Sequence, residues 1–119
     1  MTLLFVYGTL KRGCSNHRYL LDQTFIGPAR TVPGFRLYDL GGYPGMVPHP
    51  EDQSGVAGEV WSVDAAALQR LDEFEGTHEG LYRREPVALQ PPFGDTAVEA
   101  YFSNLGVEGR REVGGQWQE

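Results

Sequence analysis

Lysine, cysteine and long hydrophobic runs are all scarce in this chain of 119 residues. Cys14 is the only cysteine, so no disulfide can form within the chain, and a reducing compartment is favoured. Lys11 is the only lysine and the net charge is −6, which argues against binding to nucleic acid or to an anionic membrane. The apolar run at the start is too short for a signal peptide or a membrane span. We therefore expect a cytoplasmic protein that binds neither nucleic acid nor membranes.

Two common binding motifs are also missing. Gly8 and Gly13 have the glycine spacing of a phosphate loop, but Cys14 stands where that motif requires lysine. The three histidines, His17, His49 and His78, lie far apart and show no metal-ligand spacing. The sequence therefore predicts neither a nucleotide-binding loop nor a metal site.

Turn residues and apolar segments predict one β-rich domain. A hydrophobic content of 40% indicates a globular protein, and the length allows a single core. Gly and Pro recur throughout and separate short apolar segments, as in a domain with many strands. We expect strands at about residues 3–7, 24–31, 34–40, 55–63, 82–89 and 96–103.

Two short helices complete the predicted fold. The first runs over about 16–22, with Ser15 or Asn16 as the candidate cap. The second is capped by Asp64 and ends at Gly76. Residues 106–119 have little apolar content and are predicted to be a C-terminal tail, lying over the surface or partly flexible, after a domain at 1–105. The fold class is α+β, with a small mixed sheet that is curled or forms a barrel.

The first strand leads into an unusual loop, Tyr7-Gly8-Thr9-Leu10. A glycine directly after a buried strand lets the backbone turn sharply and removes a side chain that would block a ligand. Such a loop can direct backbone N–H groups at an anion or at a developing oxyanion. An ordinary turn between a strand and a loop explains the glycine equally well.

The second helix directs one carboxylate toward its apolar face. With Leu68 at zero, Leu71 lies at about 300°, Phe74 at about 240° and Glu75 at about 340°, whereas Glu73 lies at about 140°. Burial and the negative end of the helix dipole would both raise the pKa of Glu75 and fit it for proton transfer. Two alternatives remain: fraying at the helix end could turn the side chain outward, or an arginine, Arg83 or Arg84, could pair with it.

These segments together resemble the gamma-glutamylcyclotransferase family. The start of the chain, with Lys11-Arg12-Gly13 and Asn16-His17 after the tetrad, is most similar to the gamma-glutamylamine cyclotransferase branch. The resemblance covers roughly residues 3–103. Its later segments are, in order, Gly42-Tyr43-Pro44-Gly45, Leu71-Asp72-Glu73-Phe74-Glu75-Gly76, Tyr82-Arg83-Arg84 and Ala100-Tyr101-Phe102.

The resemblance implies an enzyme that releases 5-oxoproline from a γ-glutamyl amine or γ-glutamyl amino acid. The α-amine of the substrate attacks its own γ-carbonyl, and Glu75 acts as general acid and base. The backbone N–H groups of Gly8, Thr9 and Leu10 would hold the substrate carboxylate or the oxyanion. Tyr7 would line the cleft, and Tyr82 or Tyr101 would orient Glu75 through a hydroxyl. No cofactor or metal is implied, the partner is a small molecule, and a monomer is expected.

Three other functions compete with this hypothesis. A protein of the same fold could bind a small ligand without turnover. An acyl hydrolase could use Cys14 or Thr9 as nucleophile with a histidine base. An interaction module without a pocket is the third, and it has the least support in the sequence.

Overall fold

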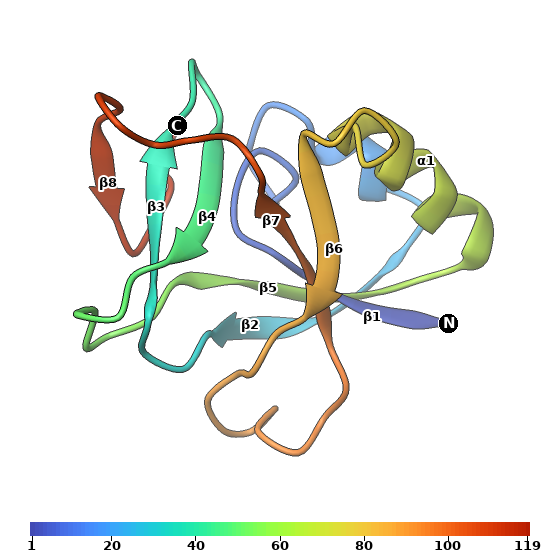
Figure 1. Cartoon of the computed structure of the whole chain (residues 1–119). Helices are drawn as coiled ribbons and strands as arrows, with labels where there is room; N and C mark the ends of the chain where they lie inside the picture. The colour runs from blue at the N-terminus through green and yellow to red at the C-terminus, as the bar shows by residue number, and fades with distance from the viewer.

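The computed structural model describes all 119 residues and contains two β-sheets (Figure 1). The larger sheet has the strand order β2-β5-β1-β7-β6, in which only the β1–β7 pair is parallel. Its strands are β1 (Thr2–Val6), β2 (Thr24–Arg30), β5 (Ala57–Val63), β6 (Tyr82–Pro86) and β7 (Glu99–Ser103). The smaller, antiparallel sheet has the order β4-β3-β8, formed by Pro44–Pro48, Phe35–Asp39 and Glu112–Gly114.

Strand β1 lies at the centre of the larger sheet and is buried on both faces. Leu4 and Phe5 are fully buried and Val6 is 3% exposed. Successive side chains of a strand point to opposite faces, so Leu4 and Val6 join one apolar cluster whereas Phe5 joins the other. The continuous apolar run at the start of the sequence is explained by this double burial.

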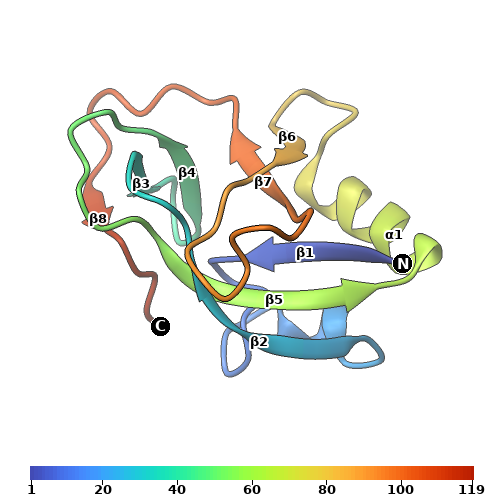
Figure 2. The ribbon, with the colours of Figure 1, turned by 90° about the horizontal axis from the view of Figure 1, so that it is seen from below.

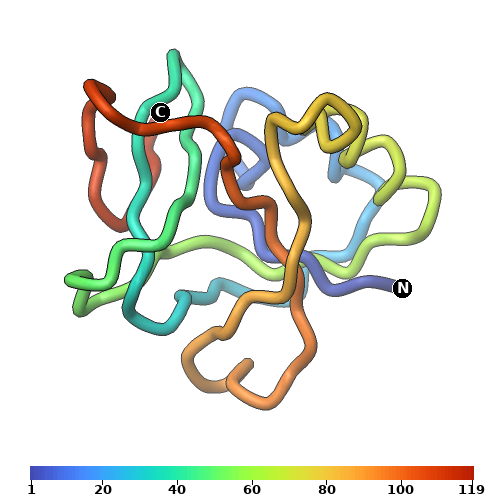
Figure 3. Tube along the Cα trace, viewed as in Figure 1, coloured from blue at the N-terminus to red at the C-terminus, as the bar shows by residue number.

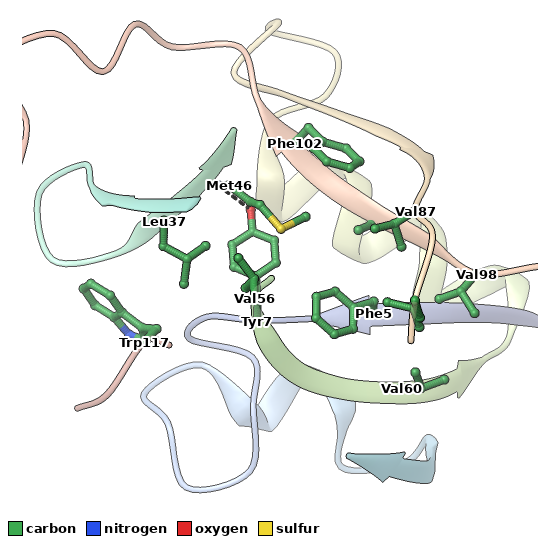
Figure 4. Packing of buried hydrophobic residues seen from close by; sticks show 12 residues of the cluster. Phe5, Tyr7, Leu37, Met46, Val56, Val60, Val87, Val98, Phe102 and Trp117 are labelled. Carbon is green, nitrogen blue, oxygen red and sulfur yellow. Dashed lines mark hydrogen bonds between the residues drawn. The ribbon is translucent and has the colours of Figure 1, made fainter. Parts of the chain in front are cut away.

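The first apolar cluster connects the two sheets (Figure 4). Phe5 and Val60 from the larger sheet pack with Leu37 and Met46 from the smaller one. Tyr7 lies between them, and the backbone N–H of Met46 donates a hydrogen bond of 3.2 Å to its hydroxyl. The end of β1 is thereby held against β4.

The second cluster is covered by helix α1 (Ala65–Glu75), which lies at the opposite end of the molecule from the smaller sheet (Figure 2). Ala67 and Leu71 are the buried residues of this helix. Asp64 caps it by accepting a hydrogen bond of 2.7 Å from the N–H of Ala67, and Gly76 ends it in the left-handed conformation with φ at +72°. Both helix ends lie where the sequence predicts them.

Other details of the helices differ from the prediction. The first predicted helix is a short 3₁₀ turn, η1 (His17–Leu20), and Asn16 makes no side-chain capping bond to it. Phe74, which the helical wheel places on the apolar face, is 38% exposed. Phe74 instead stacks against Tyr19 of η1, with ring centroids 4.5 Å apart.

The α+β class is confirmed, but the sheets are not closed into a barrel, and two strands are missing from the prediction. Strand β4 follows a Gly-Gly-Tyr turn and contains two prolines, which weaken a strand pattern. Strand β8 lies within 106–119, the segment predicted as a tail. Figure 3 shows this part of the chain, in orange to red, crossing from the larger sheet to the smaller one. Its Trp117 is 8% exposed and packs in the first cluster, so this one side chain anchors the segment to the core.

No helix of the fold has the length and apolar content that a membrane crossing requires.

Packing of Trp117 gives a test of the fold. We expect Trp117→Ala to lower the free energy of unfolding by about 3 kcal/mol, because truncation of a buried aromatic side chain leaves a cavity. Urea unfolding followed by circular dichroism measures the change. Gln118→Ala, at the exposed neighbouring position, is the matched control and should leave the stability unchanged. Equal stability of both variants would show that residues 106–119 do not pack in the core.

Candidate active site

A cavity of about 340 Å³ lies where β1 ends, between the last turn of α1 and the start of β4. The structure brings every predicted site residue to this one cavity, although they come from four separate parts of the chain. Its lining includes Tyr7, Gly8, Thr9, Leu10, Glu75, Tyr82 and Tyr101.

The loop after β1 passes so close to β4 that only glycine fits at position 8. A Cβ atom on Gly8 would lie 2.6 Å from the Pro44 side chain. The carbonyl oxygens of Gly8, Thr9 and Leu10 all accept hydrogen bonds within the chain. Their donors are Lys11 N (3.1 Å), Asn16 N (2.8 Å) and His17 Nδ1 (2.9 Å), respectively.

The N–H groups of Gly8, Thr9 and Leu10, in contrast, have no acceptor within the chain. Three successive donors beside a cavity are suited to an anionic oxygen of a ligand. Asn16 supports this loop rather than capping η1, since its Nδ2 donates a hydrogen bond of 3.0 Å to Thr9 Oγ1.

Tyr7, Tyr82 and Tyr101, three of the four tyrosines that line the cavity, use their hydroxyl groups to connect neighbouring segments of the fold. The Tyr7 hydroxyl donates to Tyr101 O (2.6 Å), and the Tyr82 hydroxyl donates to Pro44 O (2.8 Å). The Tyr101 hydroxyl donates to Asp72 Oδ1 at 2.7 Å. Neither Tyr82 nor Tyr101 bonds Glu75 directly, because each hydroxyl donates to another acceptor, and only an indirect role in orienting Glu75 stays open to them.

Glu75 is the one carboxylate that lines the cavity, and it makes no hydrogen bond or ion pair within the chain. Burial raises its pKa to about 7. The two alternatives from the sequence do not apply: Glu75 faces the cavity rather than bulk solvent, and both arginines are bound elsewhere. Arg83 pairs with Glu85 (2.8 Å), whereas Arg84 pairs with Asp72 (2.9 Å) and Glu99 (2.7 Å).

Asp72, one helical turn before Glu75, has the opposite environment. Burial acts to raise its pKa, but hydrogen bonds from Arg84 and Tyr101 keep that pKa below its usual value. Asp72 is thus ionised and ties the last turn of α1 to β6 and β7. Two carboxylates whose environments separate their pKa values in this way are characteristic of acid–base sites, with the unpaired one available for chemistry.

The phenols around Glu75 stay neutral. Burial raises the pKa of Tyr7, Tyr82 and Tyr101, and the neighbouring charge of Glu75 raises each further. No lysine, arginine or histidine lines the cavity, so Glu75 is the one group there that can take up or release a proton near neutral pH.

The structure offers no support for the cysteine nucleophile. Cys14 does not line the cavity, and burial together with the charge of Glu119 raises the pKa of its thiol, which disfavours the reactive thiolate. Thr9 lines the cavity, but no histidine base accompanies it there. Nor do three or more His, Cys, Asp and Glu side chains gather anywhere as metal ligands.

Some lining residues are absent from the predicted substrate-binding set. The sequence singles out Tyr43 and Pro44 only as part of a segment resembling the family, and Asn16 only as a candidate helix cap and part of the family resemblance. Leu81 and Leu105 also line the cavity. Neither leucine follows a pattern in the sequence, since they lie in irregular segments that the β6 and β7 strands bring to the cavity.

Comparison with known proteins identifies the family of the chain. The family model described as gamma-glutamyl cyclotransferase, AIG2-like, matches residues 4–119. A putative gamma-glutamylcyclotransferase of Vibrio cholerae is 43% identical over 99 residues, covering 83% of this chain and 81% of the relative. The gamma-glutamylaminecyclotransferase of Rattus norvegicus is 43% identical over 97 residues, covering 76% of this chain and 63% of the rat protein. The match thus spans less than two thirds of the rat protein.

Solved structures show the same fold. The crystal structure of an AIG2-like protein from Mus musculus has a TM-score of 0.79 at 32% identity, over 91% of this chain and 81% of the mouse chain. The solution structure of ytfP from Escherichia coli has a TM-score of 0.68 at 30% identity, over 98% of this chain and 95% of that one. With the family model matching nearly its whole length, the chain belongs to the gamma-glutamyl cyclotransferase, AIG2-like family.

Proposed function

We propose that the protein is a gamma-glutamylcyclotransferase that releases 5-oxoproline from a γ-glutamyl amine or γ-glutamyl amino acid, with Glu75 as general acid and base. The observation that carries the proposal is the unpaired, desolvated carboxylate of Glu75, in one cavity with the free N–H donors of Gly8, Thr9 and Leu10. Membership of the family and the name of the rat relative support it further.

The reaction consists of one bond formed, one bond broken and two protons carried from the α-nitrogen to the leaving nitrogen. The substrate α-ammonium gives a proton to Glu75, and the resulting amine attacks the γ-carbonyl carbon. The tetrahedral intermediate then loses its original amide nitrogen as the leaving group. Glu75 returns the proton to that nitrogen, because an amine anion is a very poor leaving group, and the second proton lost by the attacking nitrogen is taken up by the departing amine. The products are 5-oxoproline and a free amine, and no water is consumed.

The raised pKa of Glu75 lowers the free-energy cost of the first proton transfer. An α-amino group has a pKa of about 8, so transfer to an ordinary glutamate with a pKa of about 4.3 would cost about 5 kcal/mol. Transfer to Glu75, with its pKa at about 7, costs about 1.4 kcal/mol. Desolvation alone therefore removes most of the barrier to generating the nucleophile, and the protonated form is still acidic enough to return the proton.

The free N–H groups of the loop would hold the negative charge of the substrate. Both the α-carboxylate and the tetrahedral oxyanion need donors, and the cavity contains no cation to supply them. The nucleophile is already tethered to the carbonyl that it attacks, so the remaining task of the cavity is to fix the substrate in the conformation that closes the ring.

The first prediction concerns Glu75. We expect Glu75→Gln to lower kcat for release of 5-oxoproline by about 10²–10⁴-fold, because glutamine can neither accept nor return the proton. Mass spectrometry of reactions with a panel of γ-glutamyl compounds measures the product. Cys14→Ala, which lies outside the cavity, is the control and should keep full activity. A folded wild-type protein that binds these compounds without releasing 5-oxoproline would instead be a non-catalytic binding protein.

The second prediction concerns pH. Proton uptake requires the carboxylate form of Glu75, so kcat/KM should rise with pH and level off above about 7, the pKa of Glu75. It should fall again above about 8, where the free substrate loses the proton that the leaving nitrogen needs. Initial rates in buffers spanning mildly acidic to mildly alkaline pH give the profile. An acidic limb centred at the ordinary glutamate pKa of about 4.3 would contradict the proposed role of desolvation.

The third prediction concerns the positioning of Glu75. Tyr101→Phe removes the hydroxyl bond to Asp72 but keeps the ring, so we expect kcat to fall by about tenfold while KM changes little. Because Arg84 still holds Asp72, the thermal transition should shift only slightly. Unchanged kcat in Tyr101→Phe would show that this contact does not position the catalytic turn.

A further inference from the structure

Residues 117–119 bind the loop between β1 and η1 from outside the cavity. Lys11 Nζ donates a hydrogen bond of 2.6 Å to Trp117 O. The Glu119 carboxylate accepts from the backbone N–H of Ser15 (2.9 Å) and from the Ser15 hydroxyl (3.2 Å). Ser15 lines the cavity, whereas Trp117 and Glu119 do not. The loop is thus bound to a segment that the proposed mechanism does not use.

The segment that contains Glu119 is itself anchored in the core. Trp117 is 8% exposed and packs in the first apolar cluster (Figure 4). Gly115 O accepts a hydrogen bond of 2.7 Å from Ala57 N, at the start of β5. The indole Nε1 of Trp117 donates to Glu119 Oε2 at 3.0 Å and so orients the carboxylate that binds Ser15. The carboxylate is therefore a fixed support for the loop.

Glu119 is ionised and accepts three hydrogen bonds. Burial acts to raise its pKa, but hydrogen bonds from Trp117 and Ser15 keep that pKa below its usual value. Hydrogen bonds to an ionised acceptor are stronger than those between neutral groups. Ser15 and Glu119 are both exposed, so we expect their contact to add little to the free energy of unfolding. Its main consequence is local, because it restricts the loop.

A continuous series of contacts leads from Glu119 to the free N–H groups of the loop. Asn16 directly follows Ser15, and it binds Thr9 twice: Asn16 N donates to Thr9 O (2.8 Å), and Asn16 Nδ2 donates to Thr9 Oγ1 (3.0 Å). Thr9 is the middle one of the three residues whose N–H groups have no acceptor within the chain. The direction of those N–H groups thus depends on a carboxylate that lies outside the cavity.

We propose that Glu119 is a positioning residue, which acts through Ser15 and Asn16 to hold the loop in the conformation that binds the negative charge of the substrate. The inference rests on the proposed function, in which the free N–H groups of the loop hold the α-carboxylate or the oxyanion. Donors that are directed in advance need no reorganisation when charge develops on the substrate. Without Glu119 the loop would have to be ordered by the substrate itself, at a cost in binding or in rate.

The kinetic test uses variants of Glu119 and of its neighbour. Glu119→Ala removes all three hydrogen bonds and changes no lining residue. We expect it to lower kcat/KM by about tenfold for the γ-glutamyl compound that wild-type protein converts fastest. The acidic limb of the pH profile should stay centred at about 7, because burial alone raises the pKa of Glu75. Glu119→Gln keeps one carbonyl acceptor and should lose less activity. Gln118→Ala, at an exposed position, is the matched control and should keep full activity.

The separate effects on kcat and KM show which anion the loop holds. A rise in KM alone would place the α-carboxylate on the loop, whereas a fall in kcat alone would place the oxyanion there. Either result supports the positioning role. Unchanged kcat/KM in Glu119→Ala that is folded by circular dichroism overturns the inference. A loss of activity with a shifted acidic limb also overturns it, because the effect would then pass through Glu75.

A measurement without substrate separates this inference from the proposed function. Nitrogen-15 relaxation gives the order parameter of each backbone N–H group in the free protein. We expect Glu119→Ala to lower the order parameters or shift the amide signals of Thr9 and Leu10, and Gln118→Ala to change neither. This result, together with no 5-oxoproline from wild-type protein, would refute the proposed function and keep the role of Glu119 in ordering the loop. Unchanged order parameters and signals in Glu119→Ala overturn the inference whatever the activity.

Discussion

The site depends on the desolvation of the Glu75 carboxylate, which no hydrogen bond or ion pair within the chain compensates. A carboxyl group whose pKa is about 7 in the folded protein and about 4.3 in the unfolded chain lowers stability by on the order of 4 kcal/mol at alkaline pH. Because the folded pKa is the higher one, this cost is absent below about pH 4, grows as the pH rises, and is complete above about 7. The rest of the fold must contribute enough free energy of unfolding to offset that cost. The same desolvation raises the pKa of Glu75 into the range that suits proton transfer.

Burial and hydrogen bonds in the segments around Glu75 offset this cost and hold those segments in place. Strand β1 is buried on both faces and ends beside β4, where Tyr7 hydrogen-bonds to Met46 and Tyr101. The last turn of α1 is tied to β6 and β7 through Asp72, which takes both the Arg84 guanidinium and the Tyr101 hydroxyl. All the strong polar interactions in this region go to the neighbours of Glu75 and none to Glu75 itself. The carboxylate is therefore held in place by its backbone and left free for a substrate.

The elements that could be predicted are those with a clear pattern of apolar residues or with capping residues at their ends. The apolar run of β1, the Asp64 cap and the Gly76 stop are all visible in the sequence, and helical spacing singles out Glu75. The environment of Phe74 could not be predicted, because a helical wheel gives the direction of a side chain but not which element packs against it. The packing of Trp117 and strand β8 escape prediction because a single aromatic residue in a glycine-rich segment has no periodicity. The partners of the tyrosine hydroxyls depend on contacts between distant segments, such as Tyr82 with Pro44, which spacing along the chain does not encode.

Titration of Glu75 itself is the most direct test of the role of desolvation. Carbon-13 NMR of protein labelled at the glutamate side-chain carboxyl carbons follows each carboxyl group as the pH is raised, and the signal missing in Glu75→Gln identifies Glu75. A desolvated carboxyl group should give a midpoint near 7 for this signal, well above those of the other glutamates. A midpoint near the ordinary value of about 4.3 would show a solvated carboxylate and would contradict the central role of desolvation in the site.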